Sequence, residues 1–128
     1  HKEDWDIAWR SNLLGWKTLF EPKALALHPR HFQPGNLKKR QTISGQIRLH
    51  AVKNQLILQL KNETWLSFLK HFIFFVPRQI TIFIYIIFFE RESLTAYSIV
   101  FRNLNLILKK RQAIMAKAKK ANRIDNVA

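Results

Sequence analysis

The residues best suited to chemistry are three carboxylates near the start of the chain, Glu3, Asp4 and Asp6. A positioned carboxylate can accept a proton from a hydroxyl group and so act as a general base. On a helix, Glu3 and Asp6 share one face, whereas Asp4 points elsewhere. Acidic residues also favour the first turn of a helix because of the helix dipole. Taken alone, the cluster therefore fits a helix start better than a catalytic site.

Composition excludes several other kinds of site. The 128 residues include no Cys, which rules out disulfides, Cys-ligated zinc or iron–sulfur centres and a thiol nucleophile. With only 3 Gly, neither a G-x-G-x-x-G nor a Walker phosphate loop can be written. A hydrophobic content of 48% indicates a chain that buries apolar surface. The net charge is +14, and almost all of this surplus lies after Asn36.

The elements that would position the carboxylates are a helix and two short strands. Apolar residues at helical spacing and Gly15 as a left-handed cap predict a helix from Glu3 to Leu14. The alternation in Trp16–Phe20 and the extended run Lys23–His28 predict two strands. We therefore expect an α/β arrangement in residues 1–45.

Residues 46–128 read as almost wholly helical. One helix ends near Asn62, and Thr64 is suited to cap the next helix, which begins at Trp65. A further helix follows Ser93, with one apolar face formed by Leu94, Tyr97, Phe101, Leu104 and Leu108. Its basic continuation runs from Lys109 to Arg123 and contains no acid.

The run Phe72–Phe89 carries a single charge, Arg78, and is long enough to span a bilayer. Pro77 is expected to break it, which leaves Ile80–Phe89 as an interfacial or re-entrant segment. Membrane contact is expected from Phe72, Phe74, Phe75, Phe83, Tyr85, Phe88 and Phe89. The alternatives are a buried pair of core helices and a nucleic-acid-binding surface. The aromatic residues do not interleave with Lys and Arg, so an anionic membrane surface explains the composition better than nucleic acid does.

Part of the chain resembles a known family. The segment Lys2–Arg10 (K-E-D-W-D-I-A-W-R), Gly15-Trp16, Pro22-Lys23-Ala24 and His28 resemble the end of the catalytic domain in family 2 glycosyltransferases, closest to bacterial rhamnosyltransferase-like members. The likeness implies a GT-A fold whose nucleotide-binding half lies upstream of His1. It also implies an α/β fragment followed by a helical, membrane-associating extension.

The resemblance assigns roles to the acidic segment. In inverting enzymes of this family a carboxylate deprotonates the acceptor hydroxyl as it attacks the anomeric carbon of a nucleotide-sugar. That role falls on Asp4, with Glu3 orienting the acceptor or the helix. Asp6 is expected to contact the acceptor or to pair with Arg10 one turn away. Trp5 is placed against the acceptor sugar, whereas Trp9 and Trp16 fit core packing better.

The resemblance also implies sites for the donor. His28 is expected as a ligand, or near-ligand, of a divalent Mg²⁺ or Mn²⁺, although its partner acidic motif is not in this chain and such ions require mostly oxygen ligands. The cations Arg30, Lys38, Lys39 and Arg40 are expected to bind the pyrophosphate. A solvated basic loop is an equally good interpretation of these four residues.

The expected function is inverting transfer of a sugar, with rhamnose suggested by the subgroup, from a nucleotide-sugar to a saccharide or lipid-linked acceptor in cell-surface polysaccharide synthesis. The fragment alone is expected to be inactive and to act at the cytoplasmic face of the inner membrane, peripherally or shallowly inserted, without nucleic acid. The alternative is a non-catalytic basic helical module that binds anionic membrane or nucleic acid.

Overall fold

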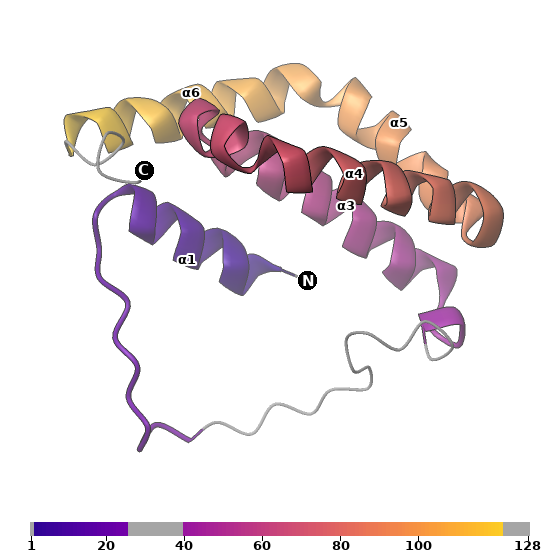
Figure 1. The fold of residues 1–128 in the computed structure, drawn as a ribbon, viewed down its shortest axis with the longest axis horizontal. Helices are drawn as coiled ribbons and strands as arrows, with labels where there is room; N and C mark the ends of the chain where they lie inside the picture. The colour runs from indigo at the N-terminus through magenta and orange to yellow at the C-terminus, as the bar shows by residue number, and fades with distance from the viewer. Residues whose placement is uncertain (1, 26–39, 122–128) are drawn as a thin grey trace.

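The computed structural model describes residues 2–25 and 40–121, and their regular structure is helical. The elements are α1 (Glu3–Leu13), α3 (Gly45–Asn62), α4 (Trp65–Phe89), the 3₁₀ turn η1 (Arg91–Leu94), α5 (Thr95–Arg102) and α6 (Leu104–Lys120). Figure 1 shows α3 in the middle, with α1 on one side and α4, α5 and α6 on the other. The helix α3 packs on α1, η1, α5 and α6 and is therefore the central element.

Local signals explain where these helices begin and end. The predicted first helix is confirmed, and Gly15 follows it with φ 84°, a left-handed conformation that glycine adopts without strain. Ser44 and Thr64 cap α3 and α4, and the Thr64 hydroxyl oxygen accepts a hydrogen bond from Ser67 N at 3.1 Å. The predicted helix end at Asn62 is also confirmed.

The expected α/β arrangement is wrong. Within residues 2–25 and 40–121 no strand is present, and Trp16–Phe20, predicted as a strand, forms neither helix nor sheet. Residues 22 and 23 form a turn, and the end of the second predicted strand lies outside the described residues. An alternating segment becomes a strand only when another strand satisfies its backbone groups, and the described part of this chain offers none.

The expected break at Pro77 is also wrong. The helix α4 is 25 residues long and continues through Pro77 without ending there. Pro77 cannot donate a backbone hydrogen bond, but its own carbonyl oxygen accepts one from Thr81 Oγ1 at 2.9 Å. The proline removes a single backbone donor while the other backbone groups of the helix can stay paired, so one lost bond does not end it.

The small core joins three helices. Val52 of α3, Ile86 of α4 and Ala96 of α5 are buried together, with Leu56 and Tyr97 packed against them. Beyond this core, the single helix predicted after Ser93 is two helices, since α5 ends at Arg102 and α6 begins at Leu104.

A buried ion pair holds the turn after α4. Glu90, 3% exposed, accepts hydrogen bonds from Arg40 Nε at 2.5 Å and from the second guanidinium nitrogen, Nη2, at 2.9 Å. Ser93 N donates to Glu90 O at 2.7 Å in the same turn. The side chain and the backbone carbonyl of Glu90 therefore together fix the point at which the chain leaves α4 and turns toward α5.

Candidate functional site

The acidic segment lies on α1, and Asp6 attaches this helix to α3. Lys61 Nζ donates to Asp6 Oδ2 at 2.7 Å, and Asn62 Nδ2 donates to Oδ1 at 2.7 Å. Arg10, one turn along α1, pairs with the same carboxylate at 3.0 Å, as the spacing predicts. Three donors thus occupy Asp6, and its position is fixed by α3.

The charge state of Asp6 depends on these donors. Burial raises the pKa of Asp6, but the hydrogen bonds from Lys61 and Asn62 and the positive charges of Lys61 and Arg10 outweigh burial and hold the pKa below its ordinary value. Asp6 is therefore an anion that connects two helices. It is a poor proton acceptor because its lone pairs are already engaged.

Asp4 lies on a different face of the same helix. Two residues correspond to about 200° of rotation around an α-helix, so Asp4 points away from the side that Asp6 turns toward α3. The side chains of Asp4 and Trp5 are exposed. Glu3 shares the Asp6 face as expected, and both residues line a cavity of about 150 Å³ between α1 and α3. That cavity is smaller than the roughly 300 Å³ at which ligand sites begin. Any reaction at this segment therefore takes place on the exposed face.

Positive charge surrounds the start of α1. Lys2 Nζ lies 4.8 Å from the centre of the Trp5 ring and donates to Gln55 of α3. Burial lowers the pKa of Lys2, the charge of Arg78 lowers it further, Asp4 opposes this and Arg40 adds to it. The exposed carboxylate of Asp4 therefore shares the neighbourhood of Lys2 with two guanidinium groups.

The residues expected to bind phosphate are only partly described. Arg40 directs its guanidinium group to Glu90, as described above, and so stabilises the fold whatever else it does. Arg30, Lys38 and Lys39 lie outside the described residues, as does His28. Among the residues that are described, no group of three or more His, Cys, Asp or Glu could hold a metal ion. The described side chains therefore do not build a metal site.

Apolar side chains are exposed around α1 and in the segment after it. Trp9 is half-buried, but Trp16 is 73% exposed, so the core packing expected of Trp16 is wrong. Leu19, Phe20 and Leu25 are each at least 87% exposed. Exposed apolar residues clustered in this way are typical of a surface that another protein segment covers.

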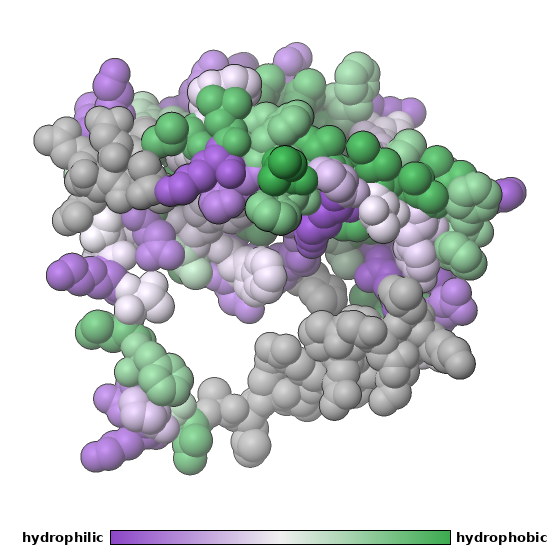
Figure 2. Space-filling model, viewed as in Figure 1, coloured by the Kyte–Doolittle hydropathy of each residue, from purple (hydrophilic) through white to green (hydrophobic). Residues whose placement is uncertain are grey.

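The second candidate surface is α4. This helix is long and apolar enough to cross a membrane, and only 6% of its most apolar 18-residue stretch is buried. The core-helix alternative therefore does not fit. Figure 2 shows hydrophobic side chains gathered along α4. Among the residues expected to contact a membrane, Phe74 and Phe88 are at least 70% exposed, whereas Phe75 and Tyr85 are half-buried.

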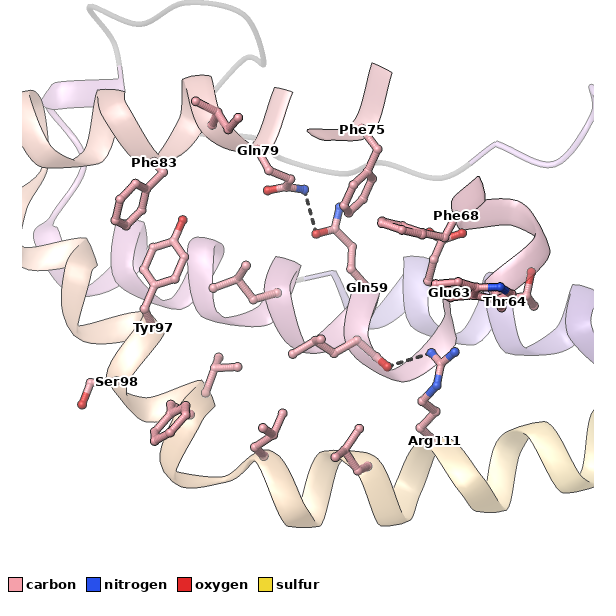
Figure 3. Close-up of a pocket in the computed structure, with 18 residues that line it drawn as sticks. Gln59, Glu63, Thr64, Phe68, Phe75, Gln79, Phe83, Tyr97, Ser98 and Arg111 are labelled. Atoms are coloured by element: carbon pink, nitrogen blue, oxygen red, sulfur yellow. Dashed lines mark hydrogen bonds between the residues drawn. The ribbon is translucent and has the colours of Figure 1, made fainter. Parts of the chain in front are cut away.

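An apolar groove lies between α4 and the other helices, and sequence reasoning did not predict it. Its volume is about 1010 Å³ (Figure 3). The side chains of Tyr97, Phe101, Leu104 and Leu108 line it, which is the apolar face that helical spacing predicts after Ser93. The opposite wall, from α4, has no comparable signal, because large apolar residues occur on every side of α4 and its sequence does not indicate which side faces inward.

Comparison with known proteins finds no matching family model, no matching curated protein and no matching solved structure.

Proposed function

We propose that this chain is the acceptor-side end of an inverting, nucleotide-sugar-dependent glycosyltransferase held at a membrane, with Asp4 as the general base. The observation that carries the proposal is that Asp4 and Asp6, two carboxylates on α1, lie in different surroundings. Asp6 attaches the helix to α3, while Asp4 remains exposed on another face. A general base must be both held in place and accessible to the acceptor. Asp6 holds the helix in place, and Asp4 on that helix is accessible.

The proposed step uses the exposed face of α1. Asp4 takes the proton of the acceptor hydroxyl while the acceptor oxygen bonds to the anomeric carbon. The nucleoside diphosphate leaves from the opposite side with the electron pair of the broken C–O bond, and the configuration inverts. Trp5 offers an exposed ring beside Asp4 on which a sugar can stack.

The remaining parts of the proposal extend beyond α1. The exposed apolar residues after α1 would be covered by the rest of the catalytic domain. Glu3 and Asp6 keep the helix in position, and a divalent metal would take its ligands from outside the described residues. The donor sugar is proposed as rhamnose, and the acceptor as a saccharide or a lipid-linked saccharide.

The test is Asp4→Asn in a protein that contains the complete catalytic domain. We expect turnover to fall by about 10²–10⁴-fold, the usual contribution of a general base, with nucleotide-sugar binding unchanged. Glu21→Gln is the matched control, because it removes another exposed carboxylate from the same part of the chain. Near-normal transfer by Asp4→Asn contradicts the assignment.

The membrane part of the proposal is supported by α4 and α6. The helix α4 offers an exposed apolar surface, and α6 carries six Lys and Arg and no acid. Basic residues near an anionic surface contribute about 1 kcal/mol each. We place the chain at the cytoplasmic face of the inner membrane, as a peripheral or shallowly inserted protein.

A flotation assay with anionic and with neutral vesicles tests this placement. We expect the chain to float with anionic vesicles and to be released by salt to a measurable extent. A DNA mobility-shift assay run in parallel tests the second candidate, a non-catalytic basic module. Tight, salt-sensitive DNA binding without flotation supports that candidate and contradicts the membrane placement.

A further inference from the structure

The apolar groove lies between the inner face of α4 and a floor made by α3, α5 and α6. Its lining includes Leu56 of α3, Phe68, Phe75 and Phe83 of α4, Tyr97 of α5 and Leu104 of α6. Figure 3 shows these aromatic side chains projecting toward the space between the helices. Few polar groups interrupt the lining, and two of them, Gln59 and Gln79, bond to each other at 2.9 Å. The groove therefore presents a hydrocarbon surface along its length.

The dimensions leave room for a hydrocarbon chain. The volume of about 1010 Å³ equals the upper end of ordinary ligand sites, which is roughly 1,000 Å³. Along α4 the lining runs from Trp65 to Phe83, which corresponds to about 27 Å of helix. The hydrocarbon core of a bilayer is about 30 Å thick and holds two layers of chains, so one acyl chain spans about 15 Å. The groove can therefore contain one such chain with room for its attachment point.

The groove is open to its surroundings rather than sealed. Ile80 and Phe101, which line it, are 54% and 78% exposed. Apolar surface left in water is unfavourable by about 25 cal/mol for each Å². The outer face of α4 is also apolar and exposed, so a chain could pass from a bilayer into the groove without crossing water. A membrane lipid is thus the occupant that can reach the groove without exposing its hydrocarbon chain to water.

Charge identifies which end of the groove takes the lipid head group. Arg111 of α6 lies at the end near Thr64 and donates one hydrogen bond to Leu60 O at 2.9 Å. A guanidinium group has five N–H donors, so others remain for a phosphate. Lys109 and Lys110 precede Arg111, and α6 contains no acid. Glu63 lines the same end of the groove and opposes an anion there, which provides a test of the charge argument.

We propose that this groove holds one acyl chain of an anionic membrane phospholipid, with the phosphate bound at Arg111. The occupancy does not depend on glycosyl transfer, because none of the residues near Asp4 lines the groove. The proposal rests on the membrane placement proposed above, but failure of the lipid proposal leaves the role of Asp4 intact, and failure of the role of Asp4 leaves the lipid proposal intact.

The test is photolabelling of the whole chain in an uncharged detergent with lysophosphatidate whose palmitoyl chain carries a diazirine. We expect adducts on groove residues such as Phe83, Tyr97 and Leu104. Leu108→Trp fills the rim of the groove and should reduce labelling at least fivefold. Leu106→Trp is its matched control, since Leu106 is an exposed residue of the same helix outside the groove lining. Circular dichroism confirms that both variants remain folded.

Substitutions at the charged end test the head group. Arg111→Gln should weaken labelling by the anionic probe about tenfold, the effect of losing one charged hydrogen bond. Lys110→Gln, which removes a neighbouring charge outside the groove lining, should weaken labelling less than Arg111→Gln does. Glu63→Gln should strengthen labelling, and an uncharged monopalmitoylglycerol probe should not respond to any of the three substitutions.

Four results overturn the proposal. Adducts spread equally over the outer face of α4, for example on Ile73 and Phe88, indicate only detergent-like coating. Equal effects of the two Trp variants exclude the groove as the binding site. Displacement of the probe by geranylgeranyl phosphate at far lower concentration than by unlabelled lysophosphatidate assigns the groove to an isoprenyl chain instead. If labelling is lost in parallel with dimerisation, which sedimentation monitors, the groove is instead covered by a second copy of this chain.

Discussion

Removal of the Asp6 carboxylate should release α1 from α3 while leaving the other helices packed. In Asp6→Ala, Lys61 loses a hydrogen bond to an anion, and both side chains of that pair are mostly buried, with 15% and 17% exposed. Asn62, which is fully buried, loses the partner of its Nδ2. The pair with Arg10 adds little, because Arg10 is 41% exposed.

These losses set the expected magnitude. A charged hydrogen bond contributes about 1.5–3 kcal/mol, and a buried donor without a partner costs about 1–3 kcal/mol. Allowing for water that reaches the vacated site, we expect α1 to lose about 3 kcal/mol of docking free energy, which is a factor of about 100 in its opening equilibrium. Amide hydrogen exchange should therefore lose about 100-fold protection in α1, with little change in α3, α5 and α6.

Asp4→Ala is the control for this experiment. It removes another acidic residue from the same first turn, and so the same favourable interaction with the helix dipole, but it does not touch the donors from α3. We expect α1 protection to change by less than about sixfold, which corresponds to 0.3–1 kcal/mol for a dipole contact. If Asp4→Ala exposes α1 as much as Asp6→Ala does, Asp6 does not hold the two helices together.

Two further predictions follow from the same kinds of contact. Because the pKa of Asp6 is lower in the folded chain than its ordinary value near 3.9, its stabilisation is complete above that value and is lost as pH falls through the lowered pKa. The protection of α1, measured relative to intrinsic exchange at the same pH, should thus fall in acid before the protection of α3 does. A loss of α1 protection already near neutral pH would contradict the assignment. Glu90→Gln should lower the free energy of unfolding by about 3 kcal/mol in a denaturant titration, because it breaks a buried pair with Arg40. Glu92→Gln, a 72% exposed carboxylate 4.0 Å from Arg48, should lower it by less than about 1 kcal/mol.

Local features of the helices could be predicted because their causes are local. Gly15 and Thr64 act on the backbone within a few residues, and the helix ends lie beside them as expected. The predicted pairing of Asp6 with Arg10 depends on the same short spacing. These contacts require no knowledge of how the chain folds back on itself.

The other contacts depend on partners distant in sequence. Lys61 meets Asp6 across 55 positions, and no periodic pattern connects them. The alternation in Trp16–Phe20 predicts a strand, but a strand also needs a partner that the described residues lack. Pro77 was expected to end a helix because its missing N–H is a local defect. The defect costs one backbone hydrogen bond and the helix continues through it.

The helix α3 gives the acidic segment and the groove a common support without making them one site. Lys61 and Asn62 hold α1, whereas Leu56 and Leu60 line the groove. A substitution that releases α1 therefore tests whether α3 transmits a structural change to the groove. Because α3 is also anchored by α5, α6 and η1, release of α1 should leave α3 in place. Asp6→Ala should accordingly leave lipid labelling unchanged, and a loss of labelling in that variant would show that the groove needs α1 docked on α3.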